Sequence, residues 1–191
     1  AMSYIHDNNF VHGDVKLENV FYTVQGEAGE AVKRDVPGEV LPLVWNIVAK
    51  VGDFGLGKDV KRETEAMEAG EESGSTMPVG QGTLTHMPPE YLRRERALGF
   101  SGDVYSFGVL LWELYTQERP YKDLKDKVEL VEYVAVQGKR LEFPNCCPKE
   151  YRKLAEDCWK GIPEQRPKFP EVIQRLNRIK EEHVENQSYN L

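Results

Sequence analysis

The pattern of hydrophobic and polar positions divides the chain into a short β-rich part and a longer helical part. Apolar runs over 19–23 and 44–51 each predict a strand. Residues 103–115 are apolar on nearly every side, which is typical of a helix buried in a core. Apolar residues recur at helical spacing over 151–159 and over 172–179, which predicts two amphipathic helices. The sequence therefore predicts an α+β fold that is predominantly α, with a small β-hairpin element and a helical core.

The remaining segments are the first six residues and three polar stretches. Residues 1–6 are typical of the last turns of a helix without a cap, so we expect the chain to be a truncated piece of a longer protein. A Gly- and Glu-rich stretch over 25–39 predicts a loop or hairpin insertion, and the polar stretch 58–78 predicts a mobile segment. We expect the polar tail from Glu181 to Leu191 to fray.

Composition excludes several classes of function. A chain of 191 residues, 40% hydrophobic and 30% charged, suits one globular domain. Its 32 acidic and 25 basic residues leave a net charge of −7, which argues against nucleic acid as a partner. No apolar run approaches the roughly 20 residues of a membrane span, so we expect no membrane segment in this chain. The three cysteines lack the spacing of a disulfide framework or a zinc site, which favours reduced thiols.

Two short motifs carry the chemistry. Asp14, Lys16 and Asn19 place a carboxylate, an ammonium and an amide within six residues, just before a predicted strand. Phosphoryl transfer needs such a set: an anion to orient the attacking hydroxyl, a cation for the transferred phosphoryl and an oxygen ligand for Mg²⁺. Asp53 ends the next apolar run and supplies a second hard oxygen ligand. Across a hairpin, Asn19 and Asp53 can meet at one metal ion.

These motifs and several others resemble the protein kinase family. The matching segments are His-Gly-Asp-Val-Lys-Leu-Glu-Asn at 12–19, Asp-Phe-Gly at 53–55, Gly-Thr-Leu-Thr-His-Met-Pro-Pro-Glu at 82–90, Ser-Gly-Asp-Val-Tyr-Ser-Phe-Gly at 101–108, Cys-Trp at 158–159 and Gln-Arg-Pro at 165–167. The local sequence at 82–90 and around Trp112 and Trp159 is similar to that of the tyrosine-kinase-like group of Ser/Thr kinases. The resemblance implies a kinase C-terminal lobe over 1–182, without the N-terminal lobe, followed by a polar tail over 183–191.

The resemblance also implies a role for each matching residue at the reaction centre, with ATP and Mg²⁺ as cofactors. Asp14 would orient the substrate hydroxyl and accept its proton, and Lys16 would neutralise charge on the γ-phosphoryl. Asn19 and Asp53 would hold Mg²⁺. Thr83 would bridge Asp14 and Lys16 through its hydroxyl. This use of a threonine hydroxyl resembles kinases that are specific for Ser/Thr rather than for Tyr.

Other matching residues would support the nucleotide site. Phe21 would lie beneath the adenine, although family members usually have a smaller aliphatic residue there. His12 and Phe54 would stack in the hydrophobic column that links the two lobes, and Gly55 would complete the Asp-Phe-Gly motif. As a single His beside a strand, His12 is expected to serve packing rather than acid–base chemistry.

Three further matches are structural. Glu90 and Arg166 would form a buried ion pair that ties the activation segment to the helical core. Asp103 would accept backbone N–H bonds from the catalytic loop. Gly13, in contrast, departs from the family, because many kinases have an Arg there that binds a phosphorylated activation loop. We therefore expect that phosphorylation of Ser73, Ser75 or Thr76 does not switch this kinase on.

The largest departure is the absence of a Gly-rich phosphate loop, of the strand Lys and of the helix Glu from the sequence. We therefore expect the isolated chain to be inactive and its partners to be the missing N-terminal lobe and a protein substrate. Reduced thiols and ATP chemistry favour the cytoplasm for this part of the protein. Two alternatives stay open. The first is a non-catalytic binding scaffold of kinase fold. The second is a small-molecule phosphotransferase of related fold, because the His-Gly-Asp motif also resembles that class, although its members lack the segments found here at 82–90 and 101–108.

Overall fold

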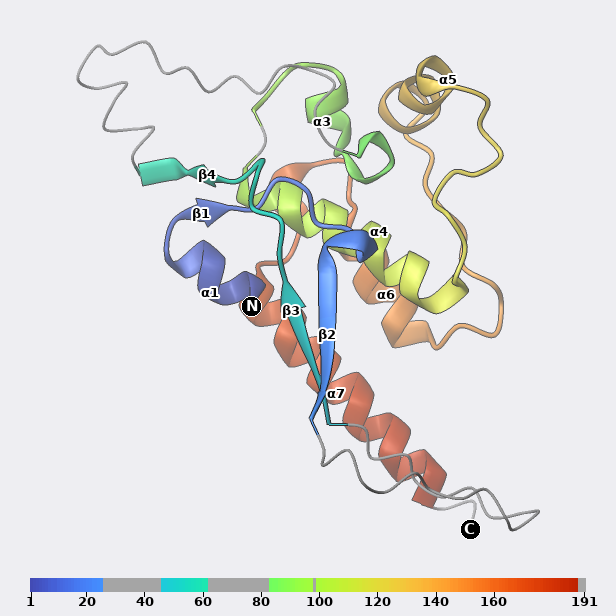
Figure 1. The fold of residues 1–191 in the computed structure, drawn as a ribbon. Helices are drawn as coiled ribbons and strands as arrows, with labels where there is room; N and C mark the ends of the chain where they lie inside the picture. Colours follow the sequence, from blue (N-terminus) through green and yellow to red (C-terminus); the bar gives the residue numbers. More distant parts are fainter. Residues whose placement is uncertain (26–45, 62–82, 98, 189–191) are drawn as a thin grey trace.

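The structure is a computed structural model that describes residues 1–25, 46–61, 83–97 and 99–188 (Figure 1). Apart from Gln25, the predicted insertion at 25–39 lies outside these ranges, as do most of the predicted mobile segment at 58–78 and Ser73, Ser75 and Thr76.

Helix α4, Phe100–Thr116, is the centre of the fold (Figure 1). Its residues are apolar around almost the whole circumference, and most of them are buried, as the pattern predicts. The helix ends at Gln117, whose N–H donates to the Glu113 carbonyl oxygen at 2.8 Å and whose left-handed backbone (φ 57°) is typical of a helix end.

Helix α6, Lys149–Cys158, packs beside α4, and helix α7, Phe169–Ser188, packs against α6, with apolar residues of both in the common core. Contact between α4 and α6 is close at Gly108. A Cβ atom there would lie 2.9 Å from the Cβ of Cys158 and 3.0 Å from the Ala155 carbonyl oxygen, so only glycine fits. The short helix α1, Met2–Asp7, packs against α7.

The β structure consists of two separate antiparallel pairs. Strands β2, Val20–Gln25, and β3, Asn46–Val51, form the predicted hairpin, with Val20 opposite Val51. Strands β1, Phe10–Val11, and β4, Lys58–Asp59, form a second pair that the sequence analysis missed.

Short helical segments complete the fold. They are η1 (Leu17–Asn19), η2 (Leu84–His86), α3 (Pro89–Leu92), α5 (Lys127–Val131), the π-helical η3 (Glu132–Val136) and η4 (Pro163–Gln165). Segment α3 contacts η3, which continues directly from α5 at the upper right of Figure 1.

These elements make an α+β fold that is predominantly helical, as the sequence predicts. One expectation about the C-terminus was wrong: α7 continues to Ser188 instead of fraying after Glu181. Three of the eight residues 181–188 are glutamate, a good helix former, which favours this continuation. In the described part of the chain, no helix has the length and apolar character needed to cross a membrane.

Candidate active site

Asp14, Lys16 and Thr83 form a compact polar cluster. The ammonium of Lys16 lies 2.7 Å from the Asp14 Oδ2 and donates a 2.7 Å hydrogen bond to the Thr83 hydroxyl. The Thr83 backbone N–H donates to the other Asp14 oxygen, Oδ1, at 3.2 Å. Thr83 therefore does connect the two residues, but its hydroxyl contacts Lys16, and its main chain contacts Asp14.

Asn19 completes the surroundings of Asp14. Its amide nitrogen donates to the Asp14 carbonyl oxygen at 2.8 Å and to the Asp14 Oδ2 at 3.1 Å. Burial alone would raise the pKa of Asp14. Hydrogen bonds from Lys16, Thr83 and Asn19, together with the Lys16 charge, outweigh burial and lower this pKa below its ordinary value. Asp14 is therefore ionised at neutral pH.

Asp103 fixes the backbone of the loop that carries Asp14. This side chain is almost fully buried at the start of α4, and its two oxygens accept 2.8 Å bonds from the backbone N–H groups of His12 and Gly13. His6 in α1 provides a third contact, with its Nε2 2.9 Å from the Asp103 Oδ2. The sequence analysis missed His6, because a single His in a short terminal helix carries no motif.

His12 is fully buried and has both ring nitrogens occupied. Its Nδ1 accepts the Asp14 backbone N–H at 3.2 Å, so the proton belongs on Nε2, which donates to the Gly52 carbonyl oxygen at 3.0 Å. These bonds hold a neutral ring between the loop and the end of β3. The Phe54 ring lies against it, with centroids 5.0 Å apart.

Gly13 has a positive φ of 82°, in the left-handed region that favours glycine. The loop turns at this residue so that both its N–H and that of His12 reach Asp103. The backbone conformation therefore gives a physical reason for a glycine at this position.

The β2–β3 hairpin brings Asn19 and Asp53 to neighbouring positions. The Gly52 N–H donates to the Asn19 carbonyl oxygen at 2.9 Å, and Asp53 follows directly. Asp53 is exposed and has a φ of 60°, which is uncommon for a residue other than glycine. Its carboxylate accepts one weak bond, from the Gly55 N–H at 3.4 Å.

The donor set of Asn19 and Asp53 fits Mg²⁺. Both bonds of the Asn19 side chain use its nitrogen, which leaves the amide oxygen for a cation. An amide oxygen and a carboxylate are hard ligands, and Mg²⁺ in phosphoryl-transfer sites takes one or two such protein ligands, with water and phosphate oxygens for the rest. Within the described ranges, no group of three or more His, Cys, Asp or Glu side chains gathers at one point as a metal site would require.

Two aromatic rings on this side of the molecule are open to solvent. Phe21 on β2 is 56% exposed, and its ring lies against Gly52. Phe54 is 45% exposed, although it also contacts the ring of Phe10 at a centroid distance of 5.9 Å. Phe54 therefore contacts His12, as the resemblance implies, but the contact is not fully covered.

Glu90 and Arg166 form a buried, bidentate ion pair, with both N–O distances 2.8 Å. The Arg166 guanidinium also donates to the carbonyl oxygens of Ser101 and Lys160 and lies over the ring of Tyr105. This pair connects α3 to the start of α4 and to the segment after α6. Removing one partner would leave a buried charge unpaired.

Comparison with known proteins agrees with this geometry. Residues 1–176 match the family of protein tyrosine and serine/threonine kinases, and the chain therefore belongs to the protein kinase family.

Similar proteins include a human protein named mitogen-activated protein kinase kinase kinase 10, which is 31% identical over 184 residues. A mitogen-activated protein kinase kinase kinase of Drosophila melanogaster is 32% identical over 182 residues, and the kinase kinase kinase zak-1 of Caenorhabditis elegans is 31% identical over 148 residues. The alignments cover 95%, 94% and 78% of this chain but only 16%, 13% and 18% of those proteins. The chain therefore spans less than a fifth of the length of these relatives.

Proposed function

We propose that this chain is the C-terminal lobe of a protein Ser/Thr kinase, which transfers the γ-phosphoryl of Mg·ATP to a hydroxyl of a protein. The observation that carries the proposal is the cluster of Asp14, Lys16 and Thr83, in which an ionised carboxylate and a cation lie 2.7 Å apart. Membership of the kinase family and the relatives named as kinase kinase kinases support the same activity.

Asp14 would accept a hydrogen bond from the substrate hydroxyl and hold it in line for attack. Because its pKa is lowered, Asp14 is a weak base, and its main contribution is orientation; it takes the proton only as the hydroxyl oxygen bonds to phosphorus. Lys16 would shift from Asp14 toward the transferred phosphoryl oxygens and neutralise their charge.

Asn19 and Asp53 would hold Mg²⁺, which when bound neutralises charge on the phosphates of ATP. Asn19 is already fixed by its bonds to Asp14, so the metal site and the acceptor site share one rigid residue. Phe21 would contact the adenine from below, on the face where its ring is exposed.

We assign residues 1–182 to the lobe and residues 183–191 to a polar extension. The exposed rings of Phe21 and Phe54 support this assignment, because an apolar face that borders the phosphoryl-transfer cluster suits a second lobe that would cover the nucleotide. The sequence itself contains no Gly-rich phosphate loop.

The decisive test is the Asp14→Asn variant of the complete native protein. We expect transfer of radiolabelled phosphate from ATP to a mixed protein substrate to fall by about 100-fold or more, because the hydroxyl loses its orienting anion. The control is Asp123→Asn, an exposed aspartate of the loop between α4 and α5, which should keep full activity.

Hydrolysis of the labelled product to amino acids tests the specificity. Phosphoserine and phosphothreonine are expected, and phosphotyrosine alone would contradict the Ser/Thr assignment. If the native protein transfers no phosphate in any condition, the scaffold alternative is correct. Transfer to a small aminoglycoside or choline-type acceptor instead of protein would favour the phosphotransferase alternative.

The 191-residue chain by itself should bind Mg·ATP weakly. Its candidate nucleotide face is open, with Phe21 and Phe54 about half exposed, so little of the adenine would be desolvated. Titration calorimetry with ATP and Mg²⁺ is expected to show little heat at micromolar protein. Sub-micromolar binding would contradict the proposal that a second lobe completes the site.

A further inference from the structure

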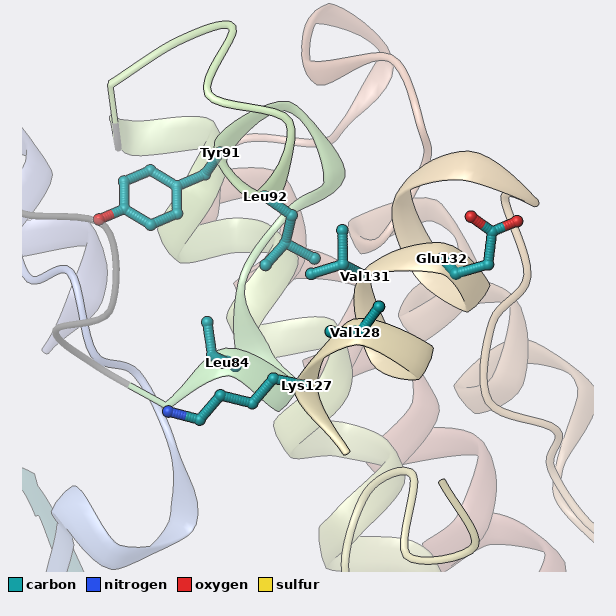
Figure 2. Close-up of a pocket in the computed structure, with 7 residues that line it drawn as sticks. All are labelled: Leu84, Tyr91, Leu92, Lys127, Val128, Val131 and Glu132. Atoms are coloured by element: carbon teal, nitrogen blue, oxygen red, sulfur yellow. The ribbon is translucent and has the colours of Figure 1, made fainter. Parts of the chain in front are cut away.

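Two adjacent cysteines, Cys146 and Cys147, lie in the segment that leads into α6 and belong to none of the sites described so far. The groove in Figure 2, between the η2–α3 segment and α5, adjoins the candidate active site because Leu84 follows Thr83, and none of the side chains that line it is a cysteine. Neighbouring thiols can pass between a reduced and a disulfide-bonded state, which a single thiol cannot do without a partner.

A tight turn holds the two thiols in different environments. The Cys147 N–H donates to the Pro144 carbonyl oxygen at 3.0 Å and closes the turn over 144–147. Cys146 is exposed on this turn, whereas Cys147 is only 4% exposed. An oxidant from solvent therefore reaches the Cys146 sulfur first.

Tyr115, in the last turn of α4, contacts the exposed thiol. Its hydroxyl donates to the Cys146 Sγ at 3.8 Å. This hydrogen bond raises the pKa of Tyr115, so the hydroxyl keeps its proton and remains a donor. A donor at sulfur stabilises the thiolate, which is the nucleophile in reactions with peroxides.

The buried thiol has a cation beside it. The Cys147 Sγ donates a weak bond to the Pro148 carbonyl oxygen at 3.7 Å. Burial raises the pKa of this thiol, and the nearby Arg152 charge partly offsets the increase. Arg152 also donates to the Pro144 carbonyl oxygen at 3.0 Å, which holds the turn against α6. Cys147 is therefore a protected thiol that lies directly after an exposed one.

From this arrangement we propose that Cys146 and Cys147 form a site of reversible modification by hydroperoxides. The Cys146 thiolate attacks the terminal oxygen of the peroxide, the O–O bond breaks, and Cys146 becomes a sulfenic acid while the other oxygen leaves and takes a proton from water. The Cys147 sulfur then attacks the Cys146 sulfur, an S–S bond forms, and the sulfenic hydroxyl leaves with the Cys147 proton as water. The two sulfurs together lose two electrons, which reduce the peroxide.

The disulfide between these neighbours is strained. Adjacent Cα atoms lie about 3.8 Å apart, below the separation of about 4.4 to 6.8 Å that is usual in disulfides. Strained disulfides are readily reduced by thiols, so the modification is reversible. Because Cys146 is exposed and Cys147 is buried, ring closure also draws the Cys147 sulfur out of its buried position.

Movement of the Cys147 sulfur weakens the contact of the turn with the core. The turn follows Phe143, which stacks on Trp159 with centroids 5.8 Å apart, and Glu142, whose carbonyl oxygen accepts the 2.8 Å bond of Trp112 Nε1. We expect oxidation to raise the equilibrium constant for unfolding in urea by about tenfold, because a cavity replaces the sulfur. A disulfide between neighbours closes no long loop, so it does not restrain the unfolded chain in compensation.

Peptide mapping of the 191-residue chain tests the inference. The reduced chain is treated with hydrogen peroxide, unfolded with N-ethylmaleimide to alkylate the remaining thiols, and digested with trypsin. Cys146 and Cys147 then lie in the peptide 141–149, and Cys158 lies in the peptide 154–160. We expect the first peptide to lack two hydrogens and carry no alkyl group, and the second to be alkylated. Dithiothreitol should restore both thiols of the first peptide.

Serine variants separate the two steps. In Cys147→Ser the reaction should stop at the sulfenic acid of Cys146, and dimedone should label this variant about tenfold more than the wild type. In Cys146→Ser the Cys147 thiol should stay reduced, because it is buried. Failure of either variant to fold leaves the peptide map of the wild type as the test.

Tyr115→Phe tests the donor at sulfur. Oxidation of Cys146 should slow by about threefold, as expected from the loss of a weak hydrogen bond. Tyr151→Phe is the matched control: its ring lies 5.6 Å from that of Tyr115, but its hydroxyl donates to the Leu111 carbonyl oxygen. This variant should oxidise at the wild-type rate, and equal slowing would assign the effect to loosening of the aromatic cluster.

Several outcomes would overturn the inference. Cys146 could form a disulfide between two chains, seen as a dimer in non-reducing electrophoresis, or become a sulfinic acid while Cys147 is alkylated. Cys158 could be oxidised as fast as Cys146, which would mean that the thiols react only after unfolding. An unfolding constant that oxidation leaves unchanged would contradict the movement of Cys147. None of these tests uses nucleotide, so the inference stands or falls independently of the proposed function.

Discussion

The two aspartates expected at the reaction centre lie in opposite environments. Asp14 is buried and receives bonds from Lys16, Thr83 and Asn19, whereas Asp53 is exposed and accepts one weak bond. The protein itself thus fixes the group that would orient the acceptor. Asp53, which would hold the metal, has carboxylate oxygens available for a cation and an uncommon backbone conformation. A bound cation would stabilise that conformation.

The largest effect on stability is expected at Asp103, which holds the loop that carries Asp14. Asp103→Ala removes the acceptor for the N–H groups of His12 and Gly13 and leaves both buried without partners. We expect the free energy of unfolding, from urea denaturation, to fall by about 3 kcal/mol. Asp123→Ala on the exposed loop should change it by less than about 0.5 kcal/mol. Equal effects of the two variants would mean that the loop does not depend on α4.

A smaller effect on stability, of opposite sign, is expected at the exposed Asp53. Asp53→Gly removes a side chain from a position with φ 60°, so stability should stay the same or rise by at most about 1 kcal/mol. Asp123→Gly, at a position without a positive φ, should lose up to about 1 kcal/mol. In the native protein, Asp53→Gly should also weaken Mg²⁺-dependent ATP binding. A clear loss of stability would show that Asp53 is fixed in a way that its contacts do not explain.

The smallest effect is the dependence of stability on pH. Because the pKa of Asp14 is lower in the folded chain than in the unfolded one, its contribution to stability is complete above the ordinary aspartate pKa of about 3.9. The contribution is lost as the pH falls through the lower, folded value. The difference in unfolding free energy between the wild type and Asp14→Asn should therefore be constant from about pH 7 to 5 and shrink below about pH 4. A difference that grows on acidification would mean that the pKa of Asp14 is raised.

Local pattern was sufficient to predict the larger elements. Helix α4 and the stripes of α6 and α7 stand out because each has several turns of apolar residues. The β2–β3 hairpin was predicted from its two apolar runs. The pair β1–β4 could not be predicted, since two residues on each strand show no period.

The candidate site was predicted residue by residue, and the contacts between those residues are what the structure adds. Motifs indicated Asp14, Asn19 and Asp53, but they did not show that the Thr83 main chain, rather than its hydroxyl, reaches Asp14. They also gave no sign of His6 at Asp103. Such contacts depend on the tertiary packing of segments about 70 to 100 positions apart, which no local pattern encodes.

The bonds between Asp103 and the loop have a consequence for hydrogen exchange. The amide protons of His12 and Gly13 are held by a carboxylate that belongs to the central helix, so they can exchange with solvent only when the helical core opens. Residues in an irregular loop would thus be protected like those of a helix interior. The Gly55 amide, at 3.4 Å from an exposed carboxylate, would exchange through local opening alone.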